Sequence, residues 1–189
     1  MSFRSRVAAC AAVSVLSLLS ALAVADEYKV DPIHSSLLFK VKHAETANFY
    51  GAFEKASGTV VTEGDAIKSV SVTIDASSVA TRNSKRDEHL RGPDFFDVKQ
   101  FPEITFTSKE VKAASDGYDV TGELTLHGST KPLTLRLVKT GSGKHMGKDI
   151  LGVETTFTIK RSDFGMSGYV GKGVGDEVTL IISLECVKQ

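Results

Sequence analysis

The side chains best suited to polar chemistry gather in one stretch of the sequence, residues 86–97. This stretch holds several charged groups together with His89 and Asp94, and it includes the adjacent apolar rings of Phe95 and Phe96. A histidine near a carboxylate can exchange protons or bind a polar group, whereas two phenylalanines contact apolar matter. Because the surrounding sequence alternates as β-strand, this segment predicts a lid or plug over an apolar interior.

A second candidate for polar chemistry is Arg161, which continues the inward parity of the expected strand over residues 153–159. An inward arginine must be paired or solvated, and Asp163 and Asp94 are candidate partners. Two interpretations stay open: these groups contact the polar end of a ligand, or they form ion pairs that fasten a helix to the sheet. The polar candidates are His34, Arg86, His89, Asp94, Arg161 and Asp163.

Signals for catalysis or for a cofactor are weak. The five histidines are dispersed, with no HxH, HExxH or Cys/His cluster, so no metal site is expected. Residues 165–168 are not a G-x-S-x-G nucleophile elbow, and the glycine-rich residues 168–175 lack the βαβ unit of a nucleotide site. We therefore expect no catalytic residue and no cofactor. An enzyme that uses His89 with Asp94 is kept as an alternative.

Alternation of apolar and polar residues dominates the rest of the sequence. In the clearest case, Tyr118, Val120, Leu124 and Leu126 lie on one face of an expected strand, and polar residues occupy the other face. The expected strands are residues 35–43, 49–62, 69–76, 103–111, 118–127, 133–137, 153–159 and 178–186.

Eight half-buried strands with short connections favour antiparallel pairing. An open sheet of that size would leave two long edges exposed, and closure removes them. We therefore predict an all-β fold, an eight-stranded antiparallel barrel, with a two-sheet sandwich as the rival. One short helix is expected from Asn83 to about Arg91, capped by Asn83 or Ser84 and stopped by Gly92-Pro93. It lies between the third and fourth expected strands, where it could cover a barrel end.

The first 25 residues have the pattern of a secretory signal peptide. Arg4 and Arg6 precede an apolar run over residues 7–22, and residues 23–25 form a small-x-small cleavage motif. The expected mature chain begins at Asp26 and forms one domain over residues 26–189. The apolar run is short for a membrane span and no basic stop-transfer cluster follows it, so no membrane anchor is expected.

Charge and cysteine content narrow the function classes. Removal of Arg4 and Arg6 lowers the Lys+Arg count from 23 to 21 against 23 Asp+Glu, which gives a net charge of −2. This balance gives no indication of a nucleic-acid partner. Cys186 is the single cysteine after residue 25, and it shares a strand face with apolar residues, so we expect a buried thiol.

Several ordered motifs resemble the YceI-like family of bacterial periplasmic proteins, often called polyisoprenoid-binding. The resemblance spans essentially all of the expected mature chain. It implies a lipocalin-like barrel that holds an isoprenoid-type lipid in a long apolar cavity, in the periplasm. The matching runs are YKVDPIHS (28–35), GAF (51–53), DASSV (75–79), RDEHL (86–90), PDFFD (93–97), FP (101–102), GELTLHGSTKP (122–132), KRSDFGM (160–166) and GDEV (175–178).

On this basis we expect an exported protein that sequesters or transports an isoprenoid or quinone-like amphiphile. A solid core, in a stress-related structural domain that binds no lipid, is the other interpretation of the inward residues. A homodimer stays open, since no residue demands it. The apolar residues expected to contact the ligand are Phe39, Phe53, Leu90, Phe95, Phe96, Phe106, Leu124, Leu126, Phe157 and Ile159.

Overall fold

The computed structural model describes residues 25–189, so the expected signal peptide, apart from Ala25, lies outside the described residues. Within these residues, no helix is both long enough and apolar enough to cross a bilayer. Asp26, the expected mature N-terminus, lies in the first strand, and its carboxylate is 2.7 Å from Lys188 Nζ. The strands are β1 (Ala25–His43), β2 (Ala47–Phe53), β3 (Ala56–Glu63), β4 (Ala66–Asp75), β5 (Val79–Ala80), β6 (Glu103–Ala114), β7 (Gly117–Leu126), β8 (Ser129–His145), β9 (Lys148–Lys160) and β10 (Val174–Lys188).

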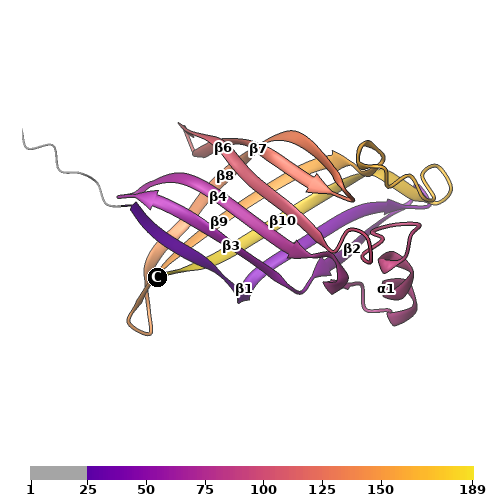
Figure 1. Cartoon of the computed structure of the whole chain (residues 1–189), viewed down its shortest axis with the longest axis horizontal. Coiled ribbons are helices and arrows are strands. Elements are labelled where there is room, and N and C mark those ends of the chain that lie inside the picture. Colours follow the sequence, from indigo (N-terminus) through magenta and orange to yellow (C-terminus); the bar gives the residue numbers. More distant parts are fainter. Residues whose placement is uncertain (1–24) are drawn as a thin grey trace, which may run out of the picture.

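Eight of the strands close into an antiparallel barrel, as predicted. The order β10-β9-β8-β7-β6-β4-β3-β1 is completed by pairing between β1 and β10 (Figure 1). The long strand β1 allows the barrel to close, because it pairs with β10 on one side and has two partners on the other. Its first part pairs with β3, and its last part, Leu37–His43, pairs with β2. A bulge between Asp31 and Ser36 separates the two parts. The short strand β5 extends β2 outside the closed ring.

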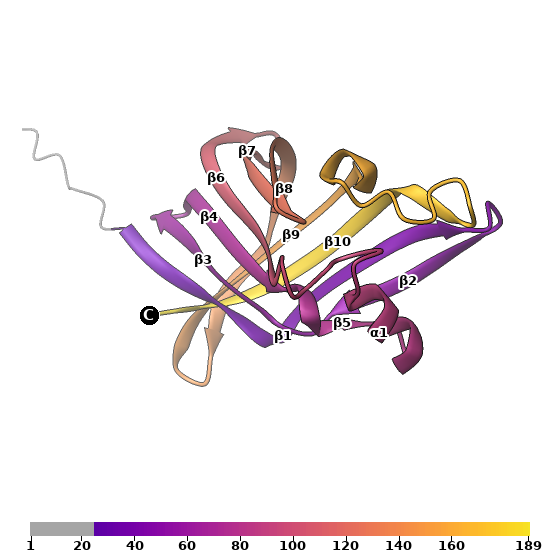
Figure 2. The ribbon, with the colours of Figure 1, turned by 45° about the vertical axis from the view of Figure 1, so that its right-hand side comes forward.

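The predicted position of the helix was wrong. Helix α1 (Ser84–Arg91) follows β5 rather than lying directly between the third and fourth strands. The expected single strand over residues 49–62 divides into β2 and β3, because the two parts of β1 need different partners. A 3-10 turn, η1 (Ala76–Ser78), then leads into β5, which pairs with the end of β2. Helix α1 therefore lies beside β2 at one end of the barrel (Figure 2).

Local hydrogen bonds explain why α1 starts and stops where it does. Asn83 caps the helix, and its side chain accepts from the backbone N–H of Arg86 at 3.0 Å. Arg86 and Asp87 both turn back to Thr81: Arg86 Nη2 donates to the Thr81 carbonyl at 2.7 Å, and Asp87 accepts from the Thr81 N–H at 2.8 Å. Gly92 ends the helix with its N–H on the carbonyl of His89. These bonds fix the helix relative to β5.

The barrel has a filled end, near the C-terminus of the chain and far from α1. Side chains from β3, β4, β9 and β10 meet there with at most 2% of their surface exposed: Val60, Ile67, Leu151 and Cys186. The predicted burial of Cys186 is confirmed, and burial raises the pKa of its thiol to about 12. At this end the alternating pattern produces a solid core.

Candidate functional site

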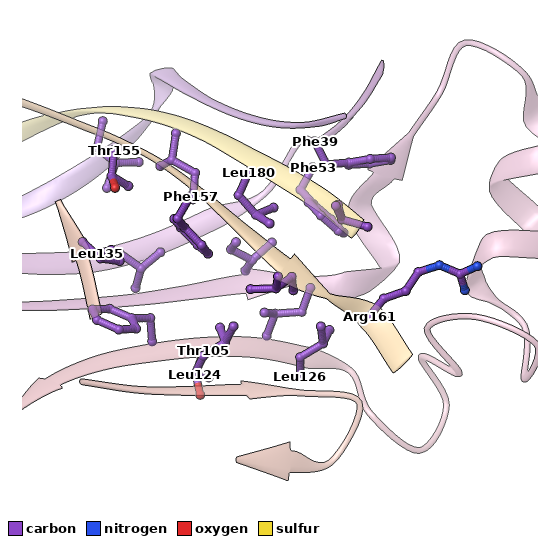
Figure 3. Close-up of a pocket in the computed structure, with 18 of the residues that line it drawn as sticks. Phe39, Phe53, Thr105, Leu124, Leu126, Leu135, Thr155, Phe157, Arg161 and Leu180 are labelled. Carbon is purple, nitrogen blue, oxygen red and sulfur yellow. The ribbon is translucent and has the colours of Figure 1, made fainter. Parts of the chain in front are cut away.

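An apolar cavity of about 160 Å³ occupies the barrel between the filled end and α1. Every one of the 29 lining residues is apolar except Thr105, Glu154, Thr155 and Arg161. Figure 3 shows the lining side chains projecting inward from the strands, with Thr155 and Arg161 toward opposite ends. All ten apolar residues expected to contact a ligand line this cavity: Phe39, Phe53, Leu90, Phe95, Phe96, Phe106, Leu124, Leu126, Phe157 and Ile159.

The hollow interior also explains the burial pattern of the inward residues. On β10, Val178, Leu180 and Ile182 point into the barrel and line the cavity, yet they are only partly buried. Phe157 on the neighbouring strand β9 behaves in the same way. A close-packed core leaves side chains at this depth almost no accessible surface. The remaining surface of these residues therefore faces the cavity.

Phe95 and Phe96 together form a plug at the mouth of the cavity, as predicted. A turn after α1 places both rings inward: the Phe95 N–H donates to the Gly92 carbonyl at 3.1 Å, and the Phe96 N–H donates to the Leu90 carbonyl at 3.0 Å. The Phe96 ring meets Phe53 edge-on at 5.4 Å between centroids. Both phenylalanines line the cavity, so movement of this turn would open or close it.

The outer side of the plug is an aromatic cluster. Phe95 stacks on Tyr169 at 5.7 Å with an interplanar angle of 3°, and His89 meets both rings edge-on. His89 Nε2 lies 3.0 Å from Asp94 Oδ2, so the expected pairing of these two residues is present. These contacts join α1, the turn after it and the loop before β10. They give His89 and Asp94 a structural role at the rim of the mouth.

Arg161 is buried, but its expected partners were wrong. Strand β9 ends at Lys160 and the 3-10 turn η2 (Arg161–Phe164) follows. Asp163 is therefore exposed, and among the described residues the side chain of Arg161 bonds only to other partners. Asp94 is instead engaged by His89.

The Arg161 guanidinium donates to three backbone carbonyls: Met166 at 2.7 Å, Gly175 at 2.9 Å and Val174 at 3.3 Å. Burial lowers the pKa of Arg161, and the nearby Asp176 carboxylate acts in the opposite direction. Arg161 lines the cavity (Figure 3). Its guanidinium joins the two ends of the loop between η2 and β10.

A second hollow of about 280 Å³ lies outside the plug, and we call it the vestibule. It shares five lining residues with the apolar cavity, so the two spaces adjoin across Phe39, Val41, Leu90, Phe95 and Val174. Arg86 and His89, two of the predicted polar residues, lie here rather than inside the barrel. The remaining residues that line the vestibule are Lys42, His43, Phe49 and Tyr169.

Thr155 marks the inner part of the cavity, away from the mouth. It is 8% exposed, and its hydroxyl has no hydrogen-bond partner among the described residues. Its neighbours across the sheet are Leu137 on β8 and Ile182 on β10, which also line the cavity. A buried hydroxyl without a partner is unfavourable by roughly 1–3 kcal/mol. Thr155 is therefore the one polar group at this depth that lacks a bond in the part of the cavity wall described here.

His34 is not brought to the cavity. It projects from the β1 bulge and lines neither hollow. Its Nδ1 lies 2.9 Å from Asp31 Oδ2 and 3.7 Å from Glu185 Oε1. Hydrogen bonding to Asp31 raises the pKa of His34, and the same contact lowers the pKa of Asp31.

These three side chains, Asp31, His34 and Glu185, are close enough to share a metal ion. Their mutual bonds and the bulge explain the arrangement without one: Ser35 Oγ donates to the Asp31 carbonyl at 2.6 Å and accepts from the Glu185 N–H at 3.1 Å. We assign the cluster to fastening β1 to β10.

The sequence reasoning missed several residues at the mouth. Lys42 and His43 end an expected strand, and Tyr169 lies in a glycine-rich loop, so no periodic pattern marks them as lining residues. Met166 and Val174 were also missed, although both lie against Arg161. The sequence signal that could have indicated a hollow at the mouth is the number of basic residues on α1 and at the end of β1.

Comparison with known proteins agrees with this geometry. The model of the YceI-like domain matches residues 28–186. The UPF0312 protein YE1254 of Yersinia enterocolitica is 40% identical over 181 residues, which cover 93% of this chain and 94% of that protein.

Two solved structures share the fold. The crystal structure of Burkholderia cenocepacia BcnA has a TM-score of 0.75 at 27% identity, covering 82% of this chain and 98% of that one. A polyisoprenoid binding domain from Saccharophagus degradans, implicated in plant cell wall breakdown, has a TM-score of 0.68 at 19% identity, covering 86% of this chain and 98% of that domain. Since the family model matches nearly all of the described residues, the chain belongs to the YceI-like family.

Proposed function

We propose that this protein carries an isoprenoid-type amphiphile in the barrel, with the tail in the apolar cavity behind Phe95 and Phe96. The observation that carries the proposal is the cavity itself, lined almost wholly by apolar side chains. A polyisoprenoid binding domain among its structural neighbours supports the ligand class. The family and these neighbours favour a binding protein over an enzyme.

The energetics of such a ligand are favourable without polar contacts. Each buried CH₂ group contributes roughly 0.8 kcal/mol, so a chain of some forty carbons would gain about 30 kcal/mol if fully buried. Measured affinities saturate near 18–21 kcal/mol, because ordering a flexible chain and forming the complex oppose the gain. Affinity therefore comes from the tail, and polar groups at the mouth select the head.

The cavity must enlarge to admit a long tail. Its volume of about 160 Å³ is below the roughly 300–1,000 Å³ of typical ligand pockets. The vestibule adjoins it across a thin wall that includes Leu90 and Phe95. Movement of the plug would merge the two spaces. A quinone, with the same kind of tail and an uncharged ring, is a second head-group class that fits this scheme.

We further propose that the chain is exported, with cleavage after Ala25, because residues 1–25 carry the features of a signal peptide. Expression of the full-length chain in a Gram-negative host, cell fractionation and intact-mass measurement test this. A mature chain that starts at Asp26 in the periplasmic fraction is expected. An uncleaved chain in the cytoplasm would contradict it.

Binding of a prenyl alcohol to a cavity-blocked variant tests the carrier proposal. Leu180→Trp places a large ring in the cavity, and Ile181→Trp, the matched control, changes the next residue of β10, which does not line it. By calorimetry, the wild type and Ile181→Trp should bind geranylgeraniol, and Leu180→Trp should lose most of the affinity. Equal binding by the two variants, or no binding by the wild type, would overturn the proposal.

A further inference from the structure

One polar side chain in the wall of the apolar cavity is both inward and unbound. The lining residues that are not apolar are Thr105, Glu154, Thr155 and Arg161. Alternation along their strands directs Thr105 and Glu154 to the outer face, and Glu154 is exposed. Arg161 lies at the mouth and donates to three backbone carbonyls. Thr155 is therefore the remaining polar side chain among the lining residues.

The surroundings of Thr155 are apolar. Leu137 and Ile182 lie beside it across the sheet, and Val153 and Phe157 are its inward neighbours along β9. All four line the cavity, and Thr155 lies at the end of the lined space away from the mouth (Figure 3). A hydroxyl in this position lacks the hydrogen bond that it makes in water, which is unfavourable.

A water molecule is a poor partner for this hydroxyl. A buried water is typically held by about three hydrogen bonds to polar groups, and the side chains beside Thr155 offer none. A valine would fill the same space without the cost of an unpaired hydroxyl. The hydroxyl is best explained by a partner that brings both an oxygen atom and apolar surface, and a ligand in the cavity can bring both.

Thr62 shows what distinguishes Thr155 from another buried threonine. The Thr62 hydroxyl also lacks a partner among residues 25–189, and this residue is 4% exposed. It lies on β3 beside a bulge and lines neither the cavity nor the vestibule. Thr155, by contrast, combines an unpaired hydroxyl with an open space beside it. A ligand in the cavity therefore reaches Thr155 but not Thr62.

Contact between the Thr155 hydroxyl and a ligand needs a small local adjustment. The hydroxyl oxygen has less than 1 Å² of accessible surface, although the residue borders the cavity. Rotation about the Cα–Cβ bond exchanges the hydroxyl and the methyl group between staggered positions. The enlargement of the cavity that a long tail requires acts in the same direction, because it exposes more of the wall.

Resting on the carrier function proposed above, we propose that Thr155 is a specificity-determining residue that binds an oxygen atom at the inner end of the ligand. The ligand class is then a prenyl-type chain with a neutral hydroxyl, ether or carbonyl oxygen at the end remote from the plug. A threonine hydroxyl can donate or accept, so it pairs with each of these groups. A charged group does not fit, because burying a charge among apolar side chains is strongly unfavourable.

Matched pairs of ligands test this proposal. Calorimetric titration compares geranylgeraniol with its ω-hydroxy derivative, and farnesol with its ω-hydroxy derivative, below their aggregation concentrations. Two chain lengths are used because the added hydroxyl must reach Thr155 while the other end of the chain lies at the mouth. The measured quantity is the ratio of the two affinities within each pair. In Thr155→Val this ratio should fall about fivefold for at least one length, the size of a neutral hydrogen bond.

Two further variants separate the hydroxyl from general changes in packing. Thr155→Ser keeps the hydroxyl and should keep most of the wild-type ratio. Thr62→Val removes a buried, unpaired hydroxyl outside the cavity and should leave the ratio unchanged. Geranylgeraniol itself should bind to Thr155→Val at least as tightly as to the wild type, because its hydrocarbon end makes no hydrogen bond with Thr155.

A prenyl alcohol with a terminal ketone gives an independent readout by infrared spectroscopy. When this ligand is bound, its carbonyl stretching band should lie at a lower wavenumber in the wild type than in Thr155→Val, because the valine has no hydroxyl to donate. The same band position in both proteins would contradict a hydrogen bond from Thr155.

The outcomes separate this proposal from the carrier function. An affinity ratio that Thr155→Val leaves unchanged at both chain lengths would overturn the role of Thr155 and leave the carrier function intact. An equal fall of the ratio in Thr62→Val, or an equal loss of both ligands in Thr155→Val, would assign the effect to packing and would also overturn it. Failure of the wild type to bind any of the four alcohols would count against the carrier function itself, and the role of Thr155 would fall with it.

Discussion

The two ends of this barrel are built from the same alternating strands, yet one is solid and the other hollow. At the filled end, Val60, Leu151 and Cys186 have almost no accessible surface. Near α1, inward residues of the same strands, such as Leu180 on β10, stop short of one another and leave the cavity. The opening there is closed by Phe95 and Phe96, from a turn between α1 and β6, instead of by strand residues. The period of the pattern decides which side chains face inward, and side-chain volume decides whether they meet.

The largest expected effect compares the same substitution at the two ends. Leu151→Ala should lower the free energy of unfolding by about 3–4 kcal/mol, because it opens a void in close-packed surroundings. Leu180→Ala should cost about 1–2 kcal/mol, since Leu180 already borders a void and loses less contact. Urea unfolding measures both. Equal losses would contradict the difference in packing.

The plug predicts a kinetic effect. Phe95→Ala removes a ring that stacks on Tyr169 and separates the cavity from the vestibule. With the contact energy of the stack lost, prenyl alcohol should enter and leave about tenfold faster, a change of roughly 1.4 kcal/mol in the barrier. Stopped-flow displacement measures the rate. Phe101→Ala is the control, because Phe101 packs on His127 outside the cavity wall; the same acceleration in that variant would contradict a gating role.

The Thr155 hydroxyl, which has no hydrogen-bond partner among the described residues, predicts that its removal does not lower the free energy of unfolding. Thr155→Val replaces a buried hydroxyl that has no bond with a methyl group of the same shape. The free energy of unfolding should stay unchanged or rise by up to about 1 kcal/mol, since no buried polar group is left unsatisfied. Thermal and urea unfolding both report it. A loss above about 1 kcal/mol would show that the hydroxyl has a partner.

Cys186 reports on the filled end without a change of sequence. Its pKa of about 12 and its complete burial leave almost no exposed thiolate near pH 8. The folded protein should therefore react with a disulfide reagent only as fast as it unfolds, and urea should expose the full reactivity of the thiol. Rapid labelling of the folded protein would mean that this end opens as readily as the mouth.

The smallest effect concerns the surface cluster at the β1 bulge. The pKa of His34 is raised above its usual 6.5, so its stabilising charge is present below that value and is lost as pH rises through the folded-state pKa. The pKa of Asp31 is lowered below 3.8 in the folded state. The stabilisation that its charged carboxylate provides is therefore lost only when the pH falls through that lowered pKa. His34→Gln should slightly flatten the dependence of stability on pH between about pH 5 and pH 8. An unchanged profile would assign the slope to other groups.

Much of this architecture could be predicted from the sequence. Alternation marked the strands, and barrel closure followed from the cost of exposed edges. The Gly92-Pro93 stop preceding Phe95 and Phe96 indicated the plug. Of the ten apolar residues expected to contact the ligand, the seven that lie on strands follow from parity.

Other features depend on three-dimensional context that a sequence pattern does not contain. The partners of Arg161 are backbone carbonyls, which no side-chain pattern marks. The division of residues 49–62 into two strands depends on how β1 is shared. Tyr169 reaches the vestibule from a loop, where periodicity gives no direction.

The hollow interior is the central claim, and native mass spectrometry of the protein freshly isolated from its own host tests it most directly. The account predicts a complex of one chain with one apolar molecule, released by organic solvent and restored when isoprenoid is added. A bare polypeptide mass that no added isoprenoid changes would contradict it.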